Sequence, residues 1–133
     1  MENERTIPVS KLNDVVDSLI NSLMPKAFSN KSYFINDIPD HFQLEKMSPV
    51  VTSVLGGLLS TVISNVKDSC IRLSAKLYGN VVLVHVKDSN GFSSHAIQGQ
   101  LQQLQTLAER NRGTIGFTTH QHSITSLTFG FYP

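Results

Sequence analysis

The chain has 133 residues, the size of one ordinary domain, and its hydrophobic content of 40% is enough to fill a core. A formal net charge of +1 with 16% charged residues argues against a general attraction to nucleic acid or to an anionic membrane. The apolar runs are too short to span a bilayer, the polar start Met1–Arg5 lacks a secretory signal, and one cysteine excludes an internal disulfide. We therefore expect one cytoplasmic domain over residues 1–133, with residues 1–5 as a disordered tail.

Two helices and one strand are predicted in the first half of the chain. Ser10 is expected to cap the first helix, and Pro25 should end or kink it. Its apolar residues recur on one helical face: Leu12, Val15, Val16, Leu19, Ile20 and Leu23. Residues 32–36 then read as a short strand and residues 37–47 as a loop.

The second helix carries the clearest start signal of the sequence. Ser48 supplies a capping side chain, and Pro49 follows at the first helical position. The apolar stripe that follows is wide, which predicts the most buried helix: Val51, Val54, Leu55, Leu58, Leu59, Val62, Ile63 and Val66. Gly56 and Gly57 each cost a helix about 1 kcal/mol relative to alanine, so they indicate close packing against a neighbour.

The second half predicts two hairpins on either side of a third helix. Residues 71–77 alternate in polarity, residues 81–86 form a β-branched run, and a turn at Tyr78-Gly79-Asn80 joins them. Residues 88–91 are expected to break regular structure. The third helix contains Ile97, Leu101, Leu104, Leu107 and Ala108, has a glutamine-rich polar face, and stops at Gly113. Residues 114–119 and 124–131 form the last hairpin.

The element order is helix, strand, helix, two strands, helix, two strands. This order predicts an α/β fold, an α+β two-layer sandwich. Its sheet should be mixed, mostly antiparallel and of about five strands, with three helices on one face.

Three stretches resemble the ATPase domain of histidine kinases, which is shared with gyrase, Hsp90 and mismatch-repair ATPases. Residues 53–65 (SVLGGLLSTVISN) resemble the asparagine-box helix, and residues 82–91 (VLVHVKDSNG) resemble the strand that leads into the first glycine box. Residues 107–115 and 127–133 resemble the end of that domain. The resemblance covers residues 6–133 in the right order and implies the same fold.

The resemblance also implies where a nucleotide would bind. Thr61 stands at the position of the asparagine that coordinates Mg²⁺ between the phosphates, and Gly57 at that of the other box asparagine. Asn65 lies one turn further on and is out of register as a substitute. Asp88 occupies the place of the aspartate that accepts a hydrogen bond from the adenine amino group, although an aspartate after a strand is also an ordinary turn residue.

The glycines of such a site are largely missing. The two glycines of the first box fall on Asn90 and Phe92, while Gly91 is out of register, so the Phe92 side chain either fills the adenine space or caps the core. The mobile lid of the family, whose glycines donate backbone N–H groups to phosphates, has only about five residues here, Ser93–Ile97.

These departures predict a vestigial nucleotide pocket made of Asp88, Thr61, Asn65, Gly91 and Phe92, without a catalytic residue, a metal or a cofactor. The expected function is that of a pseudokinase-like module in bacterial two-component signal transduction. Its partner would be a response regulator or a kinase, with self-association left open. The glutamine-rich third helix and the segment Ser93–Ile97 are the candidate surfaces.

Two other functions remain open. A divergent ATP-binding protein, a stand-alone anti-sigma-type or sensor kinase ATPase domain, would bind ATP or ADP weakly with Mg²⁺ through Asp88. A small-molecule sensor would use the vacated pocket.

Other reactive side chains carry weaker hypotheses. His95 is a poor phosphoacceptor, and His120 and His122 face the same way at a hairpin tip but lack further metal ligands. His85 lies mid-strand and is expected to be packed or hydrogen-bonded, and Cys70 to be a buried structural thiol.

Overall fold

The computed structural model describes residues 10–44, 48–120 and 123–132. The helices are α1 (Leu12–Ser29), α2 (Pro49–Ser64) and α3 (Ser94–Arg110). The strands are β1 (Ser10–Lys11), β2 (Tyr33–Asn36), β3 (Gln43–Leu44), β4 (Cys70–Tyr78), β5 (Val81–Ser93), β6 (Thr114–His120) and β7 (Ser123–Phe131). The tail predicted for residues 1–5 lies outside the described residues.

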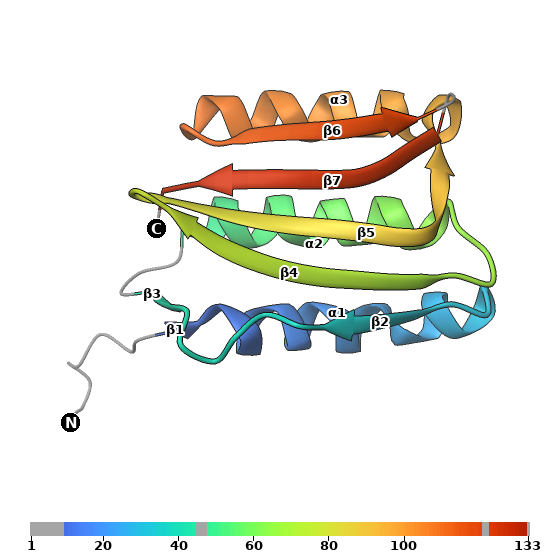
Figure 1. Ribbon diagram of the computed structural model, residues 1–133, viewed down its shortest axis with the longest axis horizontal. Coiled ribbons are helices and arrows are strands. Elements are labelled where there is room, and N and C mark those ends of the chain that lie inside the picture. Colours follow the sequence, from blue (N-terminus) through green and yellow to red (C-terminus); the bar gives the residue numbers. More distant parts are fainter. Residues whose placement is uncertain (1–9, 45–47, 121–122, 133) are drawn as a thin grey trace.

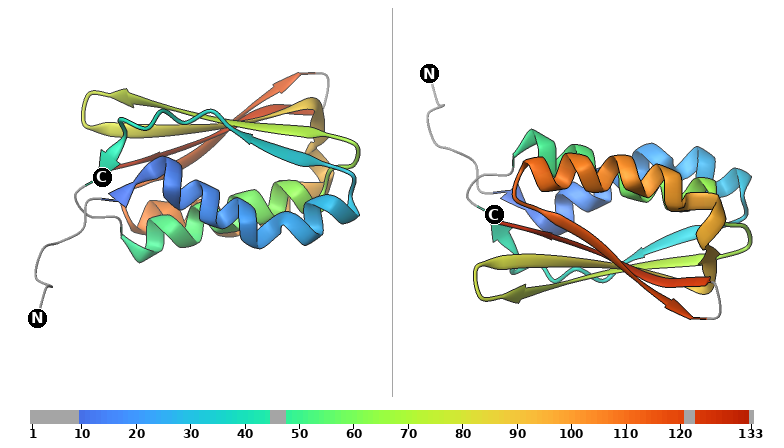
Figure 2. Two further views of the ribbon diagram at one scale, coloured as in Figure 1. Left: turned by 90° about the horizontal axis from the view of Figure 1, so that it is seen from below. Right: turned by 90° about the horizontal axis from the view of Figure 1, so that it is seen from above.

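The five-stranded sheet has the order β2-β4-β5-β7-β6 (Figure 1). β2 runs parallel to β4, and the other neighbouring strands are antiparallel. All three helices lie on one face of this sheet, so the molecule has two layers (Figure 2). The predicted α/β sandwich with a mixed, mostly antiparallel sheet is confirmed.

Helix α1 starts differently from its prediction, and the structure settles where it ends. Ser10 pairs with Leu44 in the small β1–β3 sheet, so the capping position is Lys11. The sequence left open whether Pro25 ends or kinks the helix, and the helix continues through Pro25 to Ser29. Its last turn is held by tertiary contacts, because Ala27 is buried and the Asn30 side-chain amide donates to the Ile63 carbonyl at 2.7 Å. These contacts offset the hydrogen bond that proline cannot make.

Helix α2 has the largest buried face of the three helices, as predicted, and it lies between α1 and α3. The Ser48 hydroxyl accepts a hydrogen bond from the Val50 N–H at 3.1 Å, and Pro49 is the first helical residue. The buried face consists of Val51, Val54, Leu55, Leu58, Leu59, Val62 and Ile63. Each such leucine contributes about 1.5–3 kcal/mol when fully buried. A Cβ at Gly56 would stand 3.3 Å from Leu19 of α1, which agrees with the close packing expected there.

The β4–β5 hairpin forms as predicted, with Gly79 at φ +62° in its turn. The break expected at residues 88–91 is wrong, because β5 continues to Ser93. The pairing with β7 shifts between Lys87 and Phe92 and resumes where Phe92 faces Ile124. A bulge in a long strand therefore replaces the predicted loop.

The end of α3 is built differently from the prediction. Arg112, not Gly113, takes the left-handed conformation, at φ 66°. The Gly113 N–H donates to the Ala108 carbonyl at 2.8 Å. A Cβ at Gly113 would lie 3.0 Å from the Gly130 carbonyl oxygen, so glycine is required here for close approach rather than for φ.

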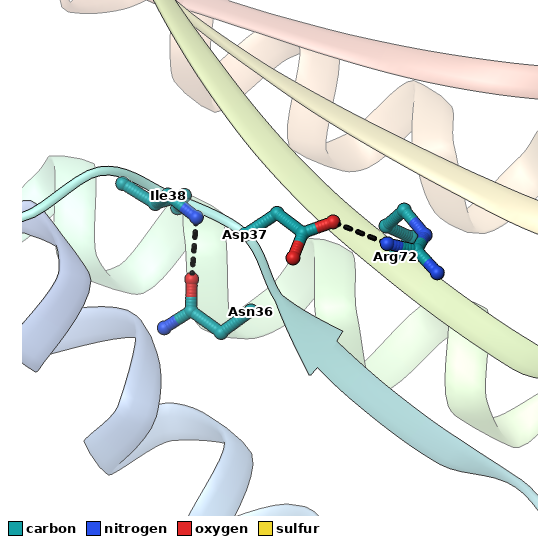
Figure 3. A network of polar contacts seen from close by, with 4 residues as sticks. All are labelled: Asn36, Asp37, Ile38 and Arg72. Carbon is teal, nitrogen blue, oxygen red and sulfur yellow. Dashed lines mark hydrogen bonds and ion pairs between the residues drawn. The ribbon is translucent and has the colours of Figure 1, made fainter.

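The segment after β2 is tied to its neighbours by side chains (Figure 3). The Asn36 side-chain oxygen accepts from the Ile38 N–H at 3.1 Å, and its amide donates to Asp17 at 2.8 Å. Asp37 forms an exposed ion pair with Arg72 of β4. These contacts join the loop to α1 on one side and to the sheet on the other.

None of the described helices is long and apolar enough to cross a membrane.

Candidate functional site

The two positions at which the resemblance places the box asparagines, and Asn65 one turn further on, form one stripe on α2. Gly57, Thr61 and Asn65 are spaced four residues apart, so they lie on the same side of the helix. Helix α3 packs against this side. A Cβ built on Gly57 would stand 2.7 Å from Leu104 Cδ2, closer than real side chains approach. The space that an asparagine would need at position 57 is therefore occupied by Leu104.

Asn65 is part of the same contact between α2 and α3. It is the capping residue at the C-terminus of α2, and its side-chain amide donates to the Thr61 carbonyl at 2.7 Å. The same nitrogen lies 3.2 Å from Gln100 Oε1 on α3. Thr61 and Asn65 are thus brought together, and Gln100 and Leu104 cover their stripe.

Asp88 lies in the sheet layer, on the face of β5 that is covered by the helices. It is buried, and its Oδ2 accepts a hydrogen bond from the Ser69 hydroxyl at 3.3 Å. The Ser69 N–H in turn donates to the Ser32 hydroxyl at 3.0 Å. The carboxylate therefore belongs to a buried polar cluster beside the start of β4. Burial of a carboxylate requires such donors, because an unpaired buried charge is costly.

The passage from β5 to α3 is direct, since α3 begins at Ser94, immediately after the last residue of β5. Gly91 and Phe92 are part of β5. The hypothesis that the Phe92 side chain fills an adenine space concerns a side chain outside the described ones. The predicted surface segment Ser93–Ile97 needs correction, because it spans a strand end and a helix start and Ile97 is buried.

No family profile matches the sequence, and no curated protein matches it either. Solved structures do match. The histidine kinase AdeS of Acinetobacter baumannii aligns with a TM-score of 0.74 and 12% identity over 94% of this chain and 66% of that one. The catalytic domain of histidine kinase ThkA aligns with a TM-score of 0.74 and 13% identity over 94% of this chain and 95% of that one.

A histidine kinase from Burkholderia phymatum aligns with a TM-score of 0.72 and 12% identity over 96% of this chain and 72% of that one. The chain has the histidine kinase ATPase fold. At these identities the likeness establishes the fold alone.

Sequence reasoning identified the α2 positions but missed the residues that cover or contact them. Leu104 was assigned only to an apolar stripe, and Gln100 only to a polar face. Ser69, the hydrogen-bond donor to Asp88, precedes β4 and belongs to no motif. One pattern in the sequence could have indicated the α2–α3 contact. The glycine pair of α2 predicts close packing, and the leucines of α3 form an apolar stripe that could pack against it.

Two other predicted residues are placed by the structure. Cys70 is half-buried rather than buried, and its hydrogen bond with the Tyr33 hydroxyl raises the pKa of Tyr33. His85 lies on the uncovered face of the sheet, with its Nδ1 3.1 Å from the Thr128 hydroxyl, so its prediction as a hydrogen-bonded strand residue is confirmed. Among the described residues, no three His, Cys, Asp or Glu side chains are grouped to hold a metal ion.

His85 should make stability depend on pH. Burial lowers the pKa of His85, and the positive charges of Lys76 and Lys87 lower it further. The unfolded chain therefore binds this proton more readily than the folded protein. As pH falls through about 6.5, protonation favours unfolding. We expect the free energy of unfolding, measured by urea denaturation, to drop more between pH about 7.5 and about 5 in the wild type than in His85→Gln.

The same comparison between pH about 7.5 and about 8.5 is the control. His85 is neutral in the folded and in the unfolded chain over this range, so it should not change how the free energy of unfolding depends on pH. If the free energy of unfolding fell equally in both proteins between pH about 7.5 and about 5, the surroundings of His85 would not disfavour its protonated form.

Proposed function

We propose that this chain is a non-catalytic, histidine-kinase-like signalling module that acts through protein–protein interaction. The proposal depends chiefly on one observation: α3 follows β5 directly and packs on the α2 stripe where the resemblance places the ligands of Mg²⁺ and triphosphate. Phosphoryl transfer requires a metal and donors that offset phosphate charge. Gly57 has no side chain, and Leu104 occupies the space where one would extend.

We infer the class of partner from solved structures that share this fold. ThkA has been solved in complex with the response regulator protein TrrA, and it aligns with this chain at a TM-score of 0.71 and 13% identity. This supports a response regulator as the class of partner. The exposed side chains of Gln98, Gln102 and Gln103 on α3 offer an uncharged polar surface for such a contact.

A second candidate function rests on Asp88. This residue keeps the place of the adenine-binding aspartate, and ShkA, which shares the fold at a TM-score of 0.67, has been solved with the nucleotide analogue AMPPNP. Weak binding of ATP or ADP with Mg²⁺ is therefore the alternative. The hydrogen bond from Ser69 and the burial of Asp88 favour a structural role instead.

A thermal unfolding experiment separates these two functions. We expect millimolar AMPPNP or ADP with Mg²⁺ to leave the unfolding temperature unchanged, whereas a ligand at 100 times its dissociation constant adds about 2.7 kcal/mol. Asp88→Ala should lower the free energy of unfolding by about 0.5–1.5 kcal/mol without any nucleotide, because the Ser69 hydroxyl loses one of its two acceptors and keeps the Lys67 carbonyl at 3.1 Å. Asp88→Asn, which keeps an acceptor oxygen, should retain more of that stability.

ShkA with AMPPNP serves as the positive control for the assay. A nucleotide-dependent stabilisation of the wild type that Asp88→Ala abolishes would establish the ATP-binding alternative and refute the proposed function.

A further inference from the structure

The face of the five-stranded sheet that the helices leave uncovered carries a concentration of positive charge (Figure 2). Three exposed cationic side chains lie on it: Arg72 and Lys76 of β4 and Lys87 of β5. The five strands contain one acidic residue, Asp88, which is buried on the other face. The whole chain has a formal net charge of only +1, so this face is more positive than the rest of the molecule.

The register of β4 with β5 arranges this face in three rows, one residue pair to a row: Arg72 with Lys87, Ser74 with His85, and Lys76 with Leu83. Side chains on one face of a strand repeat every two residues, so consecutive rows are about 6.8 Å apart. The row of His85 is the middle one. Lys76 and Lys87 therefore lie on either side of it, about 13–14 Å apart along the strands.

The middle row offers groups that can form hydrogen bonds. His85 Nδ1 lies 3.1 Å from the Thr128 hydroxyl of β7, and Ser74 is the partner of His85 on β4. All three side chains are half-buried. Burial lowers the pKa of His85, and the charges of Lys76 and Lys87 lower it further. An anion over this row would offset the two positive charges and would favour a proton on His85.

Two of the three cations are available to a partner. Arg72 forms an ion pair with Asp37, which follows β2. Among the described residues, Lys76 and Lys87 form no ion pair, and both side chains are exposed. One exposed ion pair contributes little, so a partner gains from this face only by placing several negative charges on it together.

The spacing of the rows selects an extended acidic segment. In an extended peptide, alternate side chains also lie about 6.8 Å apart on one face. Acidic residues at positions i, i+2 and i+4 would thus meet Lys87, the row of His85, and Lys76 in turn. Nucleic acid is a poorer match, because single strands are bound by aromatic rings on which bases stack, and the three rows contain no phenylalanine, tyrosine or tryptophan.

We propose that the uncovered sheet face binds an extended acidic segment of a partner protein, with carboxylates at alternate positions that contact Lys87, the row of His85, and Lys76. Charge complementarity of this kind speeds encounter and determines which partners are accepted. The inference rests on the proposed function, to which it adds a second surface, on the layer opposite α3, and the chemistry of the partner that fits it.

An NMR titration of the isotope-labelled full chain at low ionic strength tests the proposal, because it detects weak binding and locates it. The probe is the peptide Thr-Glu-Thr-Glu-Thr-Glu-Thr. We expect it to shift the amide signals of β4 and β5 rather than those of the helices. Lys76→Glu and Lys87→Glu should each weaken binding at least about threefold, and the double variant at least about tenfold.

Lys26→Glu is the matched control, because it makes the same change at an exposed position of α1 in the helix layer. It should change the affinity by less than about twofold. The peptide with glutamine in place of glutamate should not bind. Thr-Thr-Glu-Glu-Glu-Thr-Thr, which has the same charge without the alternation, should bind at least about threefold more weakly. Circular dichroism checks that each variant folds, and the variants Lys76→Gln and Lys87→Gln keep the test valid if a glutamate variant unfolds.

His85 supplies a readout that a general charge effect would not give. The groups that face His85 are Ser74 and Lys76 of β4, Lys87 of β5 and Thr128 of β7. A carboxylate among them favours the protonated imidazole. Binding of the glutamate peptide should therefore tighten at least about twofold as pH falls from about 7.5 to about 5.5, a range in which glutamate stays ionised. In His85→Gln this tightening should be lost.

Equal binding of the glutamine peptide or of the contiguous glutamate peptide overturns the proposal, as do affinities that the lysine variants leave unchanged. Tighter binding of an oligothymidylate of equal charge would overturn it in favour of nucleic acid. The nucleotide experiment above distinguishes this failure from that of the proposed function. If the chain binds nucleotide and also binds the acidic peptide, the proposed function fails and the surface assignment stands. If it binds neither, only the surface assignment fails.

Discussion

Replacing Phe129 by alanine is expected to lower the free energy of unfolding by about 3–5 kcal/mol. Phe129 is 1% exposed and lies on the helix-facing side of β7. Its ring centroid is 5.1 Å from that of Phe131, and its Cε1 would lie 3.2 Å from a Cβ at Gly113. Truncation therefore removes apolar contacts on two sides and leaves a cavity between the sheet and the end of α3.

Urea denaturation followed by circular dichroism measures this loss, and Phe28→Ala is the matched control. Both variants remove the same atoms, but Phe28 is 84% exposed, so its truncation should change stability by less than about 0.5 kcal/mol. If the two phenylalanine variants lost equal stability, Phe129 would not be packed in the core between the sheet and α3.

Placing asparagine at position 57, where the resemblance has a box asparagine, should destabilise the protein rather than create a metal site. The new Cβ would stand 2.7 Å from Leu104 Cδ2, so Leu104 must move and a polar amide must pack against it. Overpacking costs about 1–3 kcal/mol in a rigid core, and the loss here should lie near the lower end of this range because the end of the half-buried Leu104 side chain can shift. The gain in helix propensity from replacing glycine by asparagine is only a few tenths of a kcal/mol, about a third of the glycine penalty.

A double-mutant cycle with Leu104→Ala tests the cause of this loss. The double variant should recover about 0.5–3 kcal/mol relative to the sum of the single variants, because alanine at position 104 makes room for the amide. Gly99→Asn is the control, since a Cβ at Gly99 enters open space. Additive losses in the cycle would show that α3 does not close the α2 stripe.

Local signals predicted most of the fold. Helix α2 begins where it was predicted, because Ser48 caps it and Pro49 takes the first helical position. The alternating polarity of residues 71–77 likewise predicted which side of β4 is buried.

The predictions failed where tertiary contacts outweigh local preference. Ser10 was expected to cap α1 but pairs with Leu44 in the β1–β3 sheet, which no local pattern reveals. Tertiary contacts also decide between the end and the kink expected at Pro25: α1 continues there because Ala27 is buried and Asn30 bonds to α2.

The resemblance proposes which positions of the chain would form the candidate site, but it does not tell which other residues cover them. Alignment to the family showed which residue types had replaced the asparagines and glycines of the motifs. The sequence could not show that Leu104 and Gln100 lie on Gly57 and Asn65, because that contact depends on how α3 crosses α2. The direct step from Ser93 to Ser94 was also hidden, since residues 88–91 have the composition of a turn.

The uncharged outer edge of β6 has a consequence for handling the purified protein. With a formal net charge of only +1 at pH 7, molecules of this protein repel one another weakly. An edge strand without charged side chains can pair with the same strand of another molecule. We therefore expect β6 to be the place where monomers associate into sheets that continue from one molecule to the next.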